Sequence, residues 1–117
     1  MLKVDIDHKR NYNKVKWFIN FRLRWISYYY KLLPAKITFK RTHKGFHVYI
    51  KALGSWDNTH IVLFQSWLGD DWLRSVRNQN RIDTGTTEDW NLLFSQKFDS
   101  KNKTLSKEKF VSHYVLK

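Results

Sequence analysis

The stretch from Ile37 to Ile50 constrains the fold more than any other, because its apolar and polar residues alternate as they do in a β-hairpin. Side chains on a strand point alternately to opposite faces, so one face of this hairpin is apolar. That face holds Ile37, Phe39, Phe46, Val48 and Ile50. The other face is polar and cationic, with Thr38, Lys40, Thr42, His47, Tyr49 and Lys51. The pattern predicts a sheet with one face in the core and the other toward a ligand or solvent.

The elements before and after this hairpin complete an α+β pattern. Residues 2–7 alternate strictly and predict a half-buried strand with Asp5 and Asp7 on its polar side. We expect one helix from about 13 to 33 and a second from 59 to 68, which Gly69 ends.

Two further strands are expected at 81–83 and 91–98. The resulting order, β-α-β-β-α-β with an extra strand, is typical of a ferredoxin-like or RRM-like two-layer sandwich, whose helices cover one sheet face. We therefore predict a single core domain over 1–99. Residues 100–117 form a lysine-rich extension, for which the sequence leaves a helix, a strand and a loose arm open.

The charge of the chain points to a polyanionic partner. Lysine and arginine number 22 against 10 acidic residues, which gives a net charge of +12. In so small a domain this balance favours nucleic acid or nucleotide phosphate, with an acidic membrane surface as the second choice. No apolar run approaches the roughly 18 residues of a membrane span, so we expect a soluble, cytoplasmic protein without a membrane partner.

The absence of cysteine excludes disulfides, thiol nucleophiles and cysteine-ligated zinc. The histidines show no ligand spacing, so we expect no zinc site. If all strands turn their apolar sides to the helices, Asp5, Asp7 and Asp83 meet His47 on the open face. Carboxylates arranged in this way can hold two divalent metals, magnesium or manganese. Asp70 or Asp71 is an alternative third carboxylate, although helix capping also explains both.

The same residues resemble the motifs of the archaeo-eukaryotic primase and primase-polymerase superfamily. Val4-Asp5-Ile6-Asp7 is similar to its first motif, the stretch from Thr42 to Val48 to its second, and Ile82-Asp83 to its third. The resemblance implies an RRM-like catalytic core in which Asp5, Asp7 and Asp83 bind the catalytic metals. It implies that the second motif, with Thr42, Lys44 and His47, contacts the triphosphate of a nucleoside triphosphate. Lys40, Tyr49 and Lys51 would extend this pocket.

This resemblance leads to the hypothesis of a primase-type nucleotidyltransferase that acts on nucleic acid. The alternative is a non-catalytic, basic DNA- or RNA-binding protein with an RRM-like fold, including an inactive relative of the primases. In either case Lys16, Arg24 and Lys31 on the first helix would contact nucleic acid. The sequence leaves open whether a protein partner completes the site, and the small basic domain suggests a virus, plasmid or mobile element.

Overall fold

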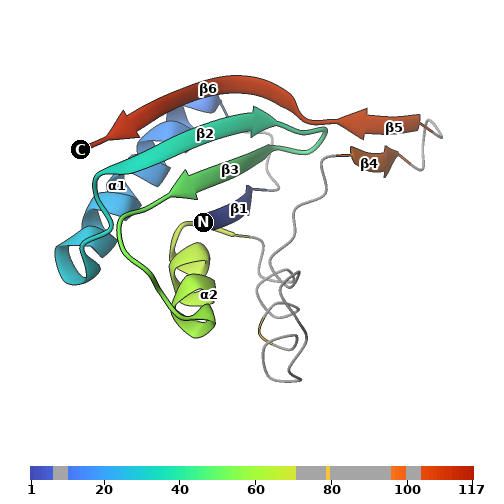
Figure 1. Cartoon of the computed structure of the whole chain (residues 1–117). Helices are drawn as coiled ribbons and strands as arrows, with labels where there is room; N and C mark the ends of the chain where they lie inside the picture. Colours follow the sequence, from blue (N-terminus) through green and yellow to red (C-terminus); the bar gives the residue numbers. More distant parts are fainter. Residues whose placement is uncertain (7–10, 71–78, 80–95, 100–103) are drawn as a thin grey trace.

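The computed structural model describes residues 1–6, 11–70, 79, 96–99 and 104–117. Four antiparallel strands form the main sheet, in the order β1-β3-β2-β6. They are β1 (Leu2–Ile6), β2 (Ala35–Arg41), β3 (Phe46–Lys51) and β6 (Lys109–Leu116). The hairpin predicted from the alternation is β2 and β3, which pair with Ile37 opposite Ile50 and Lys40 opposite His47. Figure 1 shows β6 curving along β2 at one edge of this sheet.

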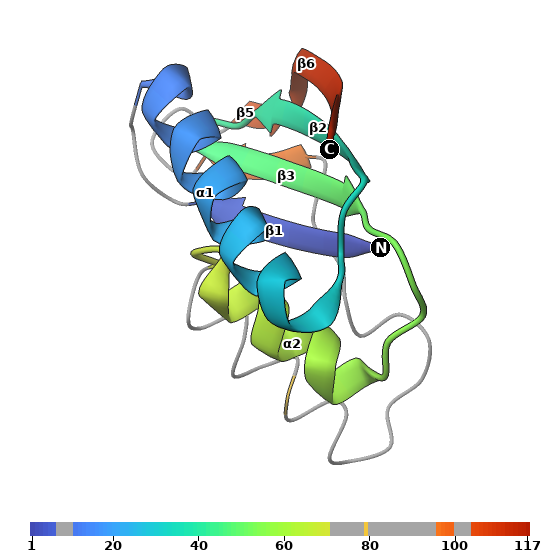
Figure 2. The same cartoon turned by 90° about the vertical axis from the view of Figure 1, so that its left-hand side faces the viewer.

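Both helices pack on one face of the sheet, as predicted (Figure 2). Helix α1 (Tyr12–Tyr30) begins at Asn11, whose side chain accepts a hydrogen bond from the Asn13 amide at 2.8 Å. It ends at Lys31, which adopts the left-handed conformation. Its aliphatic residues recur at helical spacing and are all buried: Val15, Ile19, Leu23 and Ile26. They lie in one core cluster with the inward side chains of the strands.

Helix α2 (Asn58–Trp67) ends shortly before Gly69, as the sequence predicted. Gly69 adopts a positive φ of 88°, a backbone conformation that glycine adopts without strain. The end of this helix lies against the free edge of β1. There the Lys3 amide donates to Gln65 Oε1 at 2.9 Å, and the Asp5 amide donates to Asp70 Oδ1 at 2.7 Å. These two side chains satisfy the backbone donors that a further strand beside β1 would use.

The contacts of α2 with the edge of β1 explain why the strand order differs from the predicted ferredoxin-like order. A ferredoxin-like sheet places its last strand beside the first, whereas the described strand β6 lies beside β2, at the opposite edge. The α+β class is confirmed, with a four-stranded antiparallel sheet and two described helices that are compatible with a two-layer sandwich; the ferredoxin-like order is not confirmed.

The described part of the C-terminal extension, residues 104–117, forms the strands β5 (Thr104–Lys107) and β6. A separate hairpin pairs β4 (Gln96–Asp99) with β5, and β6 follows directly. The strand predicted at 91–98 is therefore found only at its end, over β4, and its residues 91–95 lie outside the described part, as does the strand predicted at 81–83. None of the described helices is long and apolar enough to span a bilayer.

Candidate functional site

The open face of the sheet carries the polar side chains that the strand alternation predicted. Asp5 on β1 lies directly opposite His47 on β3, and Lys40 on β2 lies on the other side of His47. The next row holds Lys3, Tyr49 and Thr38, and the Thr38 hydroxyl bonds His113 Nδ1 of β6 at 2.7 Å. The prediction that Asp5 and His47 share one face is thus confirmed.

His47 is the centre of a buried polar cluster at one end of this face. Its side chain is fully buried, and Nδ1 lies 3.0 Å from Glu108 Oε2. The same carboxylate oxygen accepts a hydrogen bond from the Tyr49 hydroxyl at 2.6 Å. On the other side of the ring, Nε2 lies 3.6 Å from Asp5 Oδ1. Glu108, which directly precedes β6, therefore links β6 to His47 and Tyr49 on β3. Glu108 on one side and Asp5 on the other enclose the His47 ring.

The metal site expected here finds limited support in the described residues. Asp7 and Asp83, two of its three expected ligands, lie outside them, as does the alternative ligand Asp71. Asp70 is buried and accepts from a β1 amide. No group of three or more histidine, aspartate or glutamate residues in the described part is arranged to hold a metal ion. The carboxylates on either side of His47 do not fit a magnesium or manganese site as they stand, because His47 lies between them.

The expected triphosphate-binding residues divide between two places. Thr42 closes the β2–β3 turn: its amide donates to the Gly45 carbonyl at 2.9 Å, and its hydroxyl accepts from the Gly45 amide at 3.1 Å. Lys44 is exposed in the same turn. Lys40 instead lies over the Tyr49 ring, with Nζ 5.3 Å from the centroid. Tyr49 and His47 are thus brought together with Lys40, while Thr42 has a structural role in the turn.

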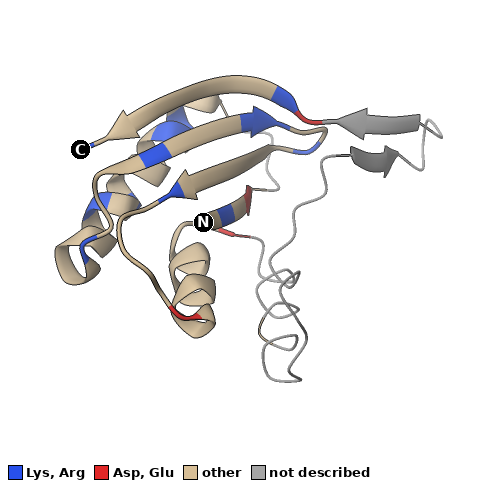
Figure 3. Ribbon diagram, viewed as in Figure 1, with Lys and Arg blue, Asp and Glu red and all other residues tan. Residues whose placement is uncertain are grey.

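Exposed cations gather at the other end of the open face. Lys36 on β2 lies directly opposite Lys51 on β3, and both side chains are exposed. Lys3 on β1, which is partly exposed, lies opposite Tyr49 and is the diagonal neighbour of Lys51. Figure 3 shows, in blue, that lysine or arginine residues lie on β1, β2 and β3. On the same face, β6 presents two exposed rings, His113 opposite Thr38 and Phe110 opposite Lys40.

The cations predicted on the first helix lie on α1, away from the open sheet face. The Lys16 ammonium sits 4.7 Å from the centroid of the Tyr114 ring, where it covers the β6 edge of the core. Arg24 is exposed, and Lys31 forms the C-terminal cap of the helix. Arg24 and Lys31 are exposed, Lys16 is partly buried, and the three residues do not extend the site around His47.

Sequence reasoning missed Glu108, the acidic residue that binds both His47 and Tyr49. It is flanked by Lys107 and Lys109 in a segment that was interpreted only as basic. A single acid within a lysine-rich stretch is the signal that could have drawn attention to it, although its partner on β3 is 61 residues away in the chain.

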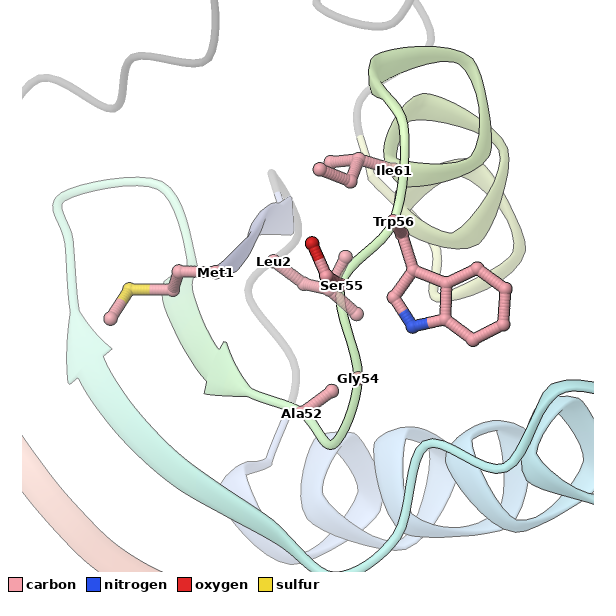
Figure 4. A pocket seen from close by; sticks show the side chains of 7 residues that line it. All are labelled: Met1, Leu2, Ala52, Gly54, Ser55, Trp56 and Ile61. Carbon is pink, nitrogen blue, oxygen red and sulfur yellow. The ribbon is translucent and has the colours of Figure 1, made fainter.

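A small hollow of about 170 Å³ lies apart from these residues, between the start of β1 and the first turn of α2 (Figure 4). Its walls include Leu2, Ala52, Trp56 and Ile61. The side chains that line it include no acid, base or histidine, so it offers no group for acid–base or metal chemistry.

Comparison with known proteins gives no family. No family model matches the chain, and neither a curated protein nor a solved structure matches it.

Proposed function

We propose that this protein binds nucleic acid through the open face of its sheet. The observation that carries the proposal is the cross-strand pair of Lys36 and Lys51, exposed and directly opposite each other. Like charges at such positions repel each other and destabilise the sheet. In the part of the chain that the structure describes, neither lysine is paired with a carboxylate. A phosphate backbone would supply the missing negative charge.

Two further features favour this partner. The chain carries a net charge of +12, so the lysine pair lies in a positive field that attracts polyanions. The exposed rings of Phe110 and His113 lie on the same face, and rings on an open sheet are a common platform for unpaired bases.

Binding of a labelled oligonucleotide, measured by fluorescence anisotropy over a range of salt concentrations, tests the proposal. Each phosphate contact contributes about 0.7 to 0.9 to the slope of log affinity against log salt concentration. The Lys36→Ala/Lys51→Ala variant should lower this slope by about 1.5. The Lys44→Ala/Lys109→Ala variant removes the same charge from exposed positions at the other end of the sheet and should lower it less. Equal slopes for the two variants would show that binding follows net charge and not this face.

A primase-type nucleotidyltransferase is the second candidate function. One observation favours it: Asp5 and His47, from the first and second resembling motifs, are direct neighbours on β1 and β3 with side chains on one face. This function would require His47 to become accessible, whereas Glu108, which also binds Tyr49, encloses it in the structure.

Calorimetry with manganese and a nucleoside triphosphate separates the two candidates. Saturable binding that Asp5→Asn removes, together with metal-dependent nucleotide incorporation by the unchanged protein, would support the enzyme. Salt-sensitive oligonucleotide binding, without triphosphate binding and without nucleotide incorporation, would support the nucleic-acid-binding function and exclude the enzyme.

A further inference from the structure

The outer face of α1 carries a set of exposed aromatic rings. Five rings on this one helix lie between 42% and 84% exposed: Trp17, Phe21, Trp25, Tyr28 and Tyr29. The aliphatic residues of the helix are all buried in the core. The apolar surface that α1 offers to solvent is therefore almost entirely aromatic, which is unusual for a helix whose buried face already packs on a sheet.

These rings lie in two groups along the helix, Trp17 with Phe21 and Trp25 with Tyr28 and Tyr29, and we call the two groups together the ring ladder. Trp17 stacks on Phe21 with centroids 5.4 Å apart and planes inclined by 9°. Further along, Trp25 meets Tyr29 at 6.0 Å, and Tyr29 meets Tyr28 at 5.1 Å. From Trp17 to Tyr29 the ladder rises about 18 Å, at 1.5 Å per residue. Its length suits several bases of an extended strand.

The charged residues of α1 itself all have one sign. The sequence of α1 contains no aspartate or glutamate, whereas it holds Lys14, Lys16, Arg22 and Arg24. Lys14 lies three residues before Trp17, and Arg24 lies four before Tyr28, so each cation borders a ring on the same face. The Arg22 guanidinium lies 5.9 Å from the centroid of Trp25. An aromatic ladder on a helix whose only charged residues are cations is complementary to a partner with flat rings and negative charge.

We infer that the outer face of α1 binds single-stranded nucleic acid, with the bases stacked on the ring ladder and the phosphates beside the cations. The inference rests on the proposed function, to which it adds a second surface and the strandedness of the partner. Unpaired bases expose their faces to stack on protein rings, whereas bases in a duplex stack on one another. A single strand therefore gains more from this face than a duplex does.

Two other occupants fit the face less well. A helix that lies in a membrane surface usually exposes aliphatic residues as well as aromatic ones, but here the aliphatic residues of the helix are buried. A second copy of the chain would bring two sets of cations together without an acid on either helix.

The test compares two variants of the whole chain that alter the most exposed rings. Trp17→Leu/Tyr28→Leu keeps apolar side chains but removes both rings. Trp17→Phe/Tyr28→Phe is the matched control, since it keeps two rings. Both residues are more than half exposed, so both variants should fold, which circular dichroism checks. The probes are labelled oligothymidine, a labelled duplex and anionic phospholipid vesicles.

Loss of one stacked base typically weakens binding about fivefold or more, so the leucine pair should bind oligothymidine about twentyfold more weakly. The phenylalanine pair should retain most of the affinity, and duplex binding should change little in either variant. Unchanged oligothymidine affinity in the leucine pair would overturn the inference, as would equal losses for single strand and duplex. Vesicle binding without oligothymidine binding would identify a membrane as the occupant instead.

The proposed function and this inference fail in different ways. If the unchanged protein binds neither oligonucleotide, both fail. If Lys36→Ala/Lys51→Ala reduces the salt slope but the leucine pair binds oligothymidine as the unchanged protein does, only the inference about α1 fails.

Discussion

Replacing Glu108 with alanine should destabilise the fold more than a surface change of the same size, because one carboxylate oxygen serves two donors. Glu108 Oε2 lies 3.0 Å from His47 Nδ1 and accepts from the Tyr49 hydroxyl at 2.6 Å. The Tyr49 side chain is partly exposed. In the Glu108→Ala variant, the fully buried ring of His47 would lose its hydrogen-bond partner. It would then carry the full free-energy penalty of a buried polar group without a partner. Such a penalty is about 1 to 3 kcal/mol, and a lost hydrogen bond to a charged acceptor costs a similar amount.

We therefore expect Glu108→Ala to lower the free energy of unfolding by about 2 to 3 kcal/mol. In a domain of this size the melting temperature should fall by about 10 °C. Tyr49→Phe should cost about 1 kcal/mol, since Glu108 then keeps its contact with His47. Urea and thermal unfolding followed by circular dichroism measure these values.

The control for this prediction is Lys109→Ala, the neighbouring exposed residue, which should change stability by less than about 0.5 kcal/mol. In the double variant, the effects of Glu108→Ala and Tyr49→Phe should fall short of additivity by about 1 kcal/mol, because both remove the same bond. The reasoning is refuted if Glu108→Ala costs no more than Lys109→Ala, or if the two site variants are additive.

Three further predictions concern the edge of β1, the pH dependence of stability and the end of α2. Gln65→Leu should cost about 1 to 2 kcal/mol in urea unfolding, because the Lys3 amide loses its acceptor; a neutral result would show that water replaces the side chain. Burial raises the pKa of Tyr114 to about 12, so the folded state keeps a proton that the unfolded chain releases near pH 10. Stability should therefore fall as pH rises from 10 to 12, and less steeply in Tyr114→Phe; parallel curves would contradict this. Gly69→Ala should lower stability by about 1 kcal/mol or more, because φ is +88° and the added Cβ would lie 3.0 Å from the Phe18 ring; an unchanged melting temperature would argue against strain at this turn.

Strand alternation was the most reliable guide to the fold and to the site. It placed Asp5 and His47 on one face and predicted the buried set that includes Val4, Phe39 and Val48, and the structure agrees at each position. The period of two is a local property of an extended backbone, so a few consecutive residues are enough to show it.

The order of the strands could not be predicted in this way. It depends on the edge of β1, where Gln65 and Asp70 bind backbone amides from more than 60 residues away. Gln65 gave no sequence signal, and Asp70 was interpreted as a helix cap or a metal ligand. Pairings over such distances are set by the packed structure as a whole, which local patterns do not encode.

The aromatic residues of α1 show a second limit of pattern reasoning. Aromatic residues at helical spacing usually indicate a core, and this holds for Phe64 of α2, which is fully buried. On α1 the four aliphatic residues already fill the side that faces the sheet, so rings such as Trp17 and Tyr28 remain outside. Composition alone could not distinguish the two cases, because the difference lies in which face the neighbouring elements leave uncovered.

The two candidate functions make opposite demands on Glu108, and this gives a way to choose between them. A histidine that contacts a triphosphate must be accessible, so the enzyme requires Glu108 to leave His47. If that contact is worth about 2 to 3 kcal/mol, the open form is only about one part in thirty to about one part in 160 of the population. The apparent affinity for a triphosphate is then reduced by the same factor. Glu108→Ala should therefore strengthen manganese-dependent triphosphate binding about thirtyfold or more if the enzyme candidate is right. If the protein only binds nucleic acid, the same change should weaken the fold and leave triphosphate binding absent.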